Sequence, residues 1–274
     1  MNRIDRRFTQ LRSDRRKALI PFVTAGDPSL EATVPVMHAL VEAGADVIEL
    51  GVPFSDPMAD GPTIQRSSER ALSRGAGLSY VFDCVRRFRE RDGDTPVVLM
   101  GYLNPVEIRG AERFAREATD AGVDGVLLVD LPPEESDEFR RAFAAHGFAL
   151  ILLASPTTTD ERMRRLCDDA QGYLYYVSFA GVTGADQLDT GAASERLHAI
   201  RQGSRVPVVA GFGIKDAASA AAMAREAEGV VVGSALVAAL ADASGPEAAA
   251  IQVRTFLAPL RAALDALPVA ADRA

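Results

Sequence analysis

Residues 43–61 read A-G-A-D-V-I-E-L-G-V-P-F-S-D-P-M-A-D-G, and this stretch contains the end of a helix, a strand and a loop. Gly44 follows a segment with helical spacing, and glycine readily adopts the left-handed conformation that ends many helices. The apolar run Val47–Leu50 is typical of a strand, and it carries Glu49. Helices joined to apolar strands by short loops are the repeating unit of an α/β fold.

The same unit recurs along the whole chain. Apolar runs predict strands at Leu19–Val23, Val47–Leu50, Val97–Met100, Gly125–Val129, Leu150–Leu153, Tyr173–Val177, Val206–Ala210 and Gly229–Val232. Apolar residues spaced at i, i+3 and i+4 predict helices between them, including Glu31–Ala43, Ala111–Ala121, Glu134–Ala145, Ala192–Ile200 and Ala217–Ala227. Gly44, Gly122 and Gly147 each follow such a helix, and a strand begins soon after each of them.

Eight β/α units in 274 residues predict a (β/α)8 TIM barrel, formed by a single domain over residues 1–274. Several strands are apolar throughout, as parallel strands covered on both faces are. A doubly wound open sheet is the competing architecture, because periodicity does not establish that the strands close into a ring. Extra helices are expected at Asn2–Leu11 and in the long loop after the second strand. Pro35 lies early in the first barrel helix, where it favours a late start or a kink.

The composition predicts a soluble cytoplasmic protein. A net charge of −8 and a pI near 5.0 argue against a surface for nucleic acid or anionic membranes. The charged N-terminal segment lacks the apolar core of a signal peptide, and no apolar run is long enough to span a membrane. Cys84 and Cys167 lie in helical patterns, where packed and reduced thiols are expected.

Three carboxylates around the second strand are candidates for chemistry. Glu49 closes a buried strand, where desolvation disfavours its charged form unless the protein uses it. Asp56 and Asp60 lie in the loop that follows. The alternative is structural: a buried glutamate paired with an arginine, and two aspartates that stabilise turns or cap a helix.

Two glycine clusters, Ala210–Gly213 and Gly233–Ala235, follow the last two predicted strands. Active sites of TIM barrels lie at this end of the strands, and phosphate commonly binds there to backbone N–H groups. Ser234 opens the last helical stretch and offers a hydroxyl donor. A third loop, Ala180–Gly184, follows the sixth strand and is placed to close over a ligand. Each cluster alone is also compatible with a tight turn, but two on consecutive strands favour a phosphate site.

The remaining chemistry-bearing residues exclude several reaction classes. The histidines lie in helical segments away from strand ends, which argues against a metal site or a histidine base: His38, His146 and His198. A Schiff-base aldolase needs a desolvated lysine at a strand end. Lys17 precedes the first strand, and Lys215 lies beyond the glycine turn of the seventh strand, so neither is suited to that role.

Carboxylates and tyrosines are therefore left for proton transfer. Glu49 and Asp60 are the best-placed pair, and Tyr175 shares a strand face with Tyr173. Tyr175 is also compatible with a purely structural role in the core. If a carbon–carbon bond breaks here without metal or imine, the substrate must supply its own electron sink. A phosphorylated substrate with an electron-rich heterocycle does so once the ring is protonated.

These motifs resemble the tryptophan synthase alpha chain family. The segment I-E-L-G-V-P-F-S-D-P-M-A-D-G-P-T-I-Q at residues 48–65 matches the family signature almost residue for residue. Further agreement lies in P-F-V-T-A-G-D-P, M-G-Y-L-N-P, V-D-L-P-P-E-E, G-V-T-G-A, G-F-G-I and G-S-A. The resemblance extends over most of the chain.

The resemblance implies reversible retro-aldol cleavage of indole-3-glycerol phosphate to indole and glyceraldehyde 3-phosphate. It makes Glu49 the general acid/base and Asp60 the group that binds the indole N–H and stabilises the protonated ring. It implies substrate contacts by Tyr175, by the phosphate-side residues Gly184, Gly213, Gly233 and Ser234, and by the pocket residues Phe22, Tyr102, Thr183 and Phe212. It implies no cofactor on this chain.

The family also implies a partner, a beta chain that carries pyridoxal phosphate, in an α2β2 heterotetramer. Apolar loop residues fit such a docking surface: Pro53, Phe54, Pro57, Asn104-Pro105-Val106 and Leu131-Pro132-Pro133. The segment Val106–Gly110 lacks an aromatic residue often found in the family, which affects only the expected partner contact. Two other functions remain as alternatives, another phosphate-binding barrel enzyme and a non-catalytic activator of the beta chain.

Overall fold

Eight parallel strands close into a barrel in the computed structural model, which describes residues 2–177, 190–211 and 213–267. Each strand pairs with its neighbours in chain order, and β8 pairs with β1, so the open sheet is excluded. The strands are β1 Ala18–Thr24, β2 Ile48–Gly51, β3 Val97–Gly101, β4 Gly125–Leu128, β5 Ala149–Ala154, β6 Leu174–Val177, β7 Val208–Gly211 and β8 Gly229–Val232. The predicted TIM barrel is confirmed.

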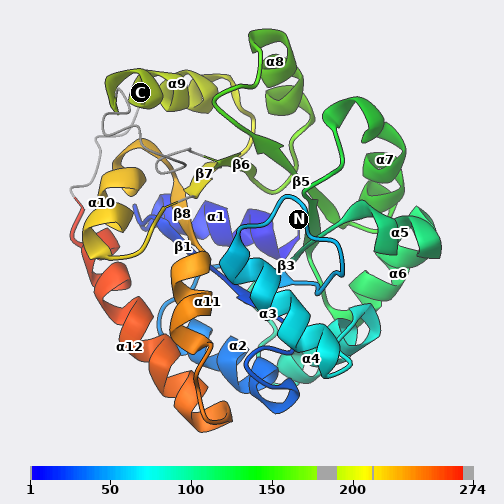
Figure 1. Cartoon of the computed structure of the whole chain (residues 1–274). Helices are drawn as coiled ribbons and strands as arrows, with labels where there is room; N and C mark the ends of the chain where they lie inside the picture. Colours follow the sequence, from blue (N-terminus) through cyan, green and yellow to red (C-terminus); the bar gives the residue numbers. More distant parts are fainter. Residues whose placement is uncertain (1, 178–189, 212, 268–274) are drawn as a thin grey trace.

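Helices surround this ring of strands (Figure 1). They are α1 Arg3–Ser13, α2 Thr33–Glu42, α3 Pro62–Ser73, α4 Leu78–Arg89, α5 Leu103–Arg109, α6 Ala111–Ala121, α7 Asp137–Ala145, α8 Asp160–Asp169, α9 Thr190–Gly203, α10 Ala217–Glu226, α11 Ser234–Leu240 and α12 Pro246–Asp265. Two 3₁₀ turns, η1 Leu30–Ala32 and η2 Pro133–Glu135, precede α2 and α7.

The extra helices expected from the sequence are α1 and α3. Helix α2 begins late, at Thr33, so that Pro35 falls in its first turn, where a missing N–H costs nothing. Gly44, Gly122 and Gly147 have the positive φ expected of helix stops. One prediction is wrong: Ser234 opens α11, but α11 is not the last helix, because α12 follows it.

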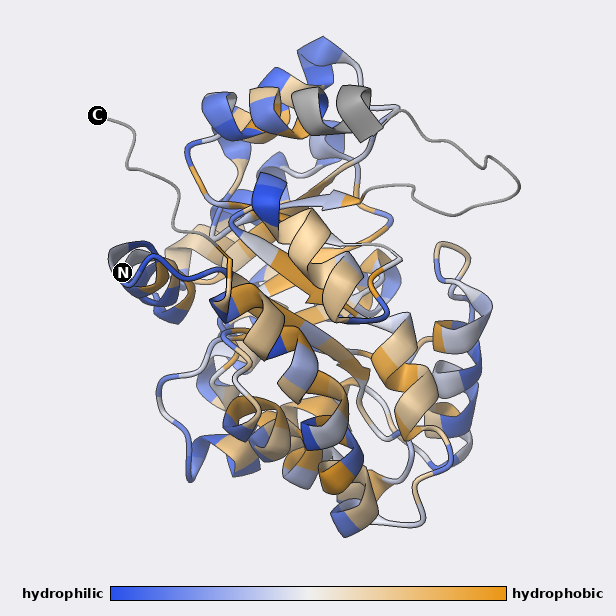
Figure 2. Cartoon of the chain, turned by 90° about the vertical axis from the view of Figure 1, so that its left-hand side faces the viewer, coloured by the Kyte–Doolittle hydropathy of each residue, from blue (hydrophilic) through white to orange (hydrophobic). Residues whose placement is uncertain are grey.

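Two apolar layers hold the barrel together. The larger lies between the strands and the surrounding helices, and the smaller fills the barrel interior. Ile4, Phe8 and Leu11 of α1 belong to the inner layer, so α1 covers the end of the barrel where the strands begin. Figure 2 shows the same division, with hydrophobic strands inside and hydrophilic surfaces on the helices.

Polar side chains placed before the even-numbered strands stabilise this same N-terminal end. They are Asp46, Asp124, Gln171 and Glu228. Each accepts a hydrogen bond of 2.9 or 3.0 Å from a backbone N–H at the start of the preceding odd-numbered strand, at Leu19, Val97, Leu150 and Val208 respectively. The same kind of hydrogen bond from a backbone N–H to a side chain thus occurs four times around the ring. It satisfies N–H groups that would otherwise be buried without an acceptor.

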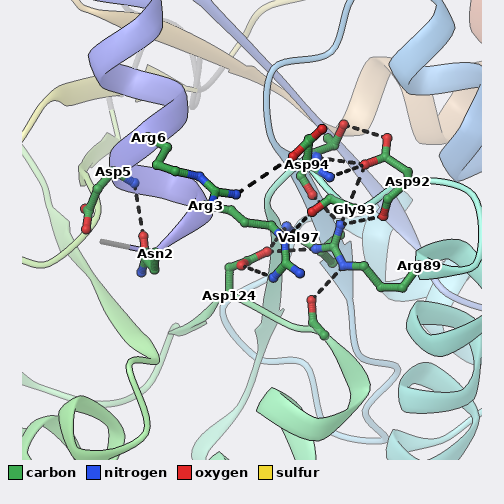
Figure 3. A network of polar contacts seen from close by, with 12 residues as sticks. Asn2, Arg3, Asp5, Arg6, Arg89, Asp92, Gly93, Asp94, Val97 and Asp124 are labelled. Carbon is green, nitrogen blue, oxygen red and sulfur yellow. Dashed lines mark hydrogen bonds and ion pairs between the residues drawn. The ribbon is translucent and has the colours of Figure 1, made fainter.

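Asp124 shows how these groups are held (Figure 3). Its carboxylate accepts from Arg3 of α1 at 2.9 Å and from Arg89 of α4 at 2.8 Å. Lys17 lies at the same end, where its Nζ donates to the carbonyl of Ala227 at 2.7 Å. The charged residues at this end therefore serve the structure, and the opposite end is left for chemistry.

Candidate active site

Glu49 lies inside the barrel near the C-terminal end of β2. It is opposite Phe22 of β1 and Val98 of β3, and its side chain is 0% exposed. Gly51, two residues further, points to the same face and leaves room for Phe22, since a Cβ there would lie 2.6 Å from the Phe22 ring. The strand thus places a carboxylate beneath the opening of the barrel, as the sequence predicted.

The Tyr173 hydroxyl donates a hydrogen bond of 2.7 Å to Oε1 of Glu49. Its Oε2 is buried, and among the described residues it has no hydrogen-bond partner. No arginine in that part of the chain forms an ion pair with Glu49, which contradicts the structural alternative. Burial raises the pKa of Glu49 from 4.5 to about 7, and the Tyr173 hydrogen bond opposes part of this rise.

Asp60 lies in the loop between β2 and α3. Its Oδ2 accepts a hydrogen bond from the Tyr102 hydroxyl at 3.2 Å, and the Ala59 N–H donates to that hydroxyl at 3.0 Å. Burial raises the pKa of Asp60, and the hydrogen bond from Tyr102 lowers it by a smaller amount. Asp60 is not the cap of α3, because Gly61 occupies that position. The simple capping role considered for it is therefore wrong.

A small pocket lies beside these groups at the C-terminal end of the strands. Its lining includes Phe22, Asp60 and Tyr102, three residues expected from the sequence, together with Thr24, Gly51, Val52, Phe54, Ile64, Ser68, Met100, Gly101 and Val129. Glu49 is fully buried and is not part of this lining. Sequence patterns missed Ile64 and Ser68, because a helix that follows a strand gives no sign of which of its residues face the barrel.

Tyr175 of β6 points toward the end of β7. A Cβ on Gly211 would lie 2.2 Å from the Tyr175 hydroxyl, so the glycine makes room for this side chain. Burial raises the pKa of Tyr175, and the charge of Glu49 adds to the rise. Tyr173 lies two residues earlier on the same face and makes the direct contact with Glu49, a role that the sequence did not assign to it.

The expected phosphate-side residues lie at the ends of β7 and β8. Gly213 is exposed and adopts a φ of 71°, while Gly233 is the N-cap of α11 and Ser234 is its first residue. A Cβ on Gly233 would lie 3.6 Å from Phe22, which connects this segment to the pocket. Three further residues expected at the site, Thr183, Gly184 and Phe212, lie outside the described residues, as does the rest of the loop after β6.

The described residues contain no group of three or more acidic, histidine or cysteine side chains able to hold a metal ion. Lys215 is exposed beyond β7, and Lys17 lies at the opposite end of the barrel, so neither is a buried amine at a strand end. Cys84 and Cys167 are buried and free. No helix in the described part of the chain is long and apolar enough to cross a membrane.

Comparison with known proteins identifies the family. The model of the family described as "Tryptophan synthase alpha chain" matches residues 8–265. The chain belongs to the tryptophan synthase alpha chain family. This membership confirms the prediction made from the motifs, and with it a lyase that cleaves indole-3-glycerol phosphate in tryptophan biosynthesis.

Individual members of the tryptophan synthase alpha chain family agree over nearly the full length. The chain is 72% identical to the tryptophan synthase alpha chain of Xanthomonas oryzae pv. oryzae (strain MAFF 311018) over 266 residues, which cover 97% of this chain and 99% of the relative. A crystal structure of subunit alpha from Legionella pneumophila str. Paris superposes with a TM-score of 0.90 at 46% identity, covering 97% and 100% of the two chains. A ligand-free tryptophan synthase structure from M. tuberculosis gives 0.85 at 34% identity, covering 96% and 99%.

The loops in which an alpha chain was expected to contact its partner are only partly exposed. Pro53, Val106 and Pro133 are buried, so they contribute to the folding of the loops themselves. Among the described residues, the large apolar side chains exposed at this end are Met58, at 85%, and Ile108, at 79%. Ile108 belongs to the segment Val106–Gly110 and presents an aliphatic side chain there.

Proposed function

We propose that Glu49 is the general acid/base of the cleavage of indole-3-glycerol phosphate. Glu49 protonates the indole ring at the carbon that bears the side chain and accepts the proton of the adjacent side-chain hydroxyl. The carbon–carbon bond then breaks, its electron pair returns to the ring, and the products are indole and glyceraldehyde 3-phosphate. The protonated ring is the electron sink, so the step needs neither a lysine nor a metal.

The observation that supports this role is the state of the Glu49 carboxyl group. An acid that must also act as a base works best with a pKa near the working pH, and burial raises the pKa of Glu49 to about 7. Tyr173 occupies one oxygen, and the other is free of partners within the described chain. One oxygen is therefore oriented, and the other is available to exchange a proton with the substrate.

Asp60 is suited to the second role, binding of the indole N–H. A carboxylate accepts this hydrogen bond and stabilises the positive charge that develops when the ring is protonated. Tyr102 donates to Oδ2 of Asp60, and it stacks on Phe54 with ring centroids 4.9 Å apart. This support holds one oxygen of Asp60 at the wall of the pocket, which Phe22 and Tyr102 also line.

The phosphate group is assigned to the ends of β7 and β8. The first N–H groups of α11 have no partners within the helix, and such groups favour an anion. Gly213, Gly233 and Ser234 are the described residues of this site, and Gly184 completes it in the loop after β6. Tyr175, Thr183 and Phe212 are assigned to the substrate side chain and ring.

We assign a beta chain as the partner, in an α2β2 heterotetramer in which that chain carries pyridoxal phosphate. Met58 and Ile108 support the assignment, because large apolar side chains exposed together with the active-site loops are typical of an interface. The described lysines of this chain are not placed to form an imine with the cofactor, which fits a cofactor held by the partner.

The decisive experiment is to add indole-3-glycerol phosphate to the purified chain and follow indole release, with and without a beta chain. We expect release in both cases and faster release with the partner. Absence of indole in both would contradict the proposal and favour another phosphate-binding barrel enzyme. Activation of the beta chain without any cleavage would identify a non-catalytic activator.

A further inference from the structure

Helix α3 is joined to the end of β1 and the loop after it by polar contacts, in which the carboxylate of Asp27 is buried and Arg70 is partly exposed. Arg74, which follows α3, also pairs with Asp27, at 3.6 Å. Arg70 of α3 donates to both carboxylate oxygens of Asp27, at 2.8 and 2.7 Å, and the Asp27 side chain is only 3% exposed. One turn earlier, the hydroxyls of Ser67 and Thr24 lie 2.7 Å apart, and both residues are buried. A two-point ion pair of this kind fixes orientation as well as distance.

Close packing reinforces these contacts. Gly26 has a φ of 90°, and a Cβ there would lie 2.6 Å from Ala76 and 3.2 Å from Ala71. Its N–H donates to the Thr33 hydroxyl at 2.9 Å, which ties the loop to α2. The loop after β1 therefore has no room to shift, and it forms a fixed base for α3.

The position of α3 determines the position of Asp60. The helix begins at Pro62, two residues after Asp60, and Gln65 in its first turn donates to the Asp60 carbonyl at 2.9 Å. The loop that forms this base follows directly from β1, and β1 pairs with β2 so that Phe22 lies opposite Glu49. The contacts at Asp27 thus fix the position of the loop that carries Asp60 relative to β1, the strand next to that of Glu49.

We propose that the Asp27–Arg70 ion pair is a positioning device for the reaction. It orients α3 so that Asp60 faces the indole site while Glu49 approaches from the neighbouring strand. Neither Asp27 nor Arg70 lines the pocket, so both act through the helix and not on the substrate. The inference rests on the role of Asp60 proposed above.

The first test is kinetic. Arg70→Met should lower kcat for indole release about tenfold or more and change KM less, because a small displacement of a reacting group is costly. Arg70→Lys keeps the charge but not the two-point geometry, so it should recover part of the rate. The lysine variant also allows the test to be made if the methionine variant does not fold. An unchanged kcat in both variants would overturn the inference.

The matched control is Arg261→Met. Arg261 pairs with Asp46 at 3.0 Å at the opposite end of the barrel. The two aspartates are similarly buried, and Arg261 is more buried than Arg70, so its loss is at least as severe a test of stability. This variant should lose thermal stability and keep its kcat. If it loses kcat as much as Arg70→Met does, the effect is general loosening of the barrel and the inference is wrong.

A double variant separates positioning from other effects. If Arg70 acts through Asp60, adding Arg70→Met to Asp60→Asn should cost little beyond Asp60→Asn alone. If the double variant instead loses rate by the product of the two single-variant factors, Arg70 acts independently of Asp60, and the inference is overturned. A near-normal rate for Asp60→Asn alone would instead remove Asp60 from the mechanism, which is a failure of the proposed function itself.

Discussion

The Tyr173 hydroxyl donates a hydrogen bond to Oε1 of Glu49 at 2.7 Å, and both side chains are fully buried inside the barrel. Tyr173 is itself supported from below by Phe8 of α1, with ring centroids 5.8 Å apart. The helix that covers the N-terminal end of the barrel thus contacts the residue that orients the proposed acid/base. The state of Glu49 in this contact should affect both the pH dependence of cleavage and the stability of the protein.

Removal of the Tyr173 hydroxyl should move the pH dependence of cleavage. The hydrogen bond stabilises the charged carboxylate, so Tyr173→Phe should raise the pKa of Glu49 further. Because Glu49 must carry a proton to protonate the indole ring, we expect the fall in the rate of indole release on the alkaline side to shift to higher pH. Tyr176→Phe is the control, because Tyr176 is buried in the outer layer, away from the barrel interior. A profile that is the same in all three proteins would contradict the role of Tyr173.

The raised pKa of Glu49 should also be visible in stability. Between pH 4.5 and about 7 the folded protein keeps the Glu49 proton, whereas the unfolded chain releases it. Stability therefore falls as pH rises through this interval, by an amount on the order of 3 kcal/mol. Glutamine does not ionise, so the Tm of Glu49→Gln relative to the parent should rise across the same interval and level off above it. Parallel Tm curves for the two proteins would show that the pKa is not raised.

The exposed apolar residues should determine the affinity for the partner. Met58→Asp and Ile108→Asp should each weaken binding of a beta chain about tenfold, because each places a charge in an apolar contact. Calorimetric titration of the two purified chains measures this effect. Ile251→Asp is the control, since Ile251 is 55% exposed on α12 and is not part of the active-site loops. Equal affinities for all variants would remove Met58 and Ile108 from the interface.

The sequence predicted the ring of strands well, because most of the buried parallel strands are largely apolar runs. Strand ends differ by one or two residues, as at β7, which begins at Val208 and not at Val206. Such ends depend on hydrogen bonds to neighbouring strands, which one chain segment does not encode. The side chains before the even-numbered strands were also missed, since their partners lie twenty or more residues away, for example Asp124 with Val97.

The sequence motifs indicated where in the fold the candidate site residues lie, but they did not indicate contacts that depend on packing alone. Glu49, Asp60, Phe22 and Tyr102 occupy the expected end of the barrel. The contact of Tyr173 with Glu49 spans 124 positions, and no local pattern reports it. Burial of Pro53, Val106 and Pro133 likewise depends on how the loops fold on one another.

The measurement that tests the central claim most directly is indole release by Glu49→Gln, with binding of indole-3-glycerol phosphate followed in parallel. Glutamine preserves the size of the side chain and can still accept the Tyr173 hydrogen bond, but it cannot exchange the proton. We predict a rate lowered by about 10²–10⁴-fold with binding retained. A variant that keeps more than about a tenth of the parent rate would contradict the assignment of Glu49 as the acid/base.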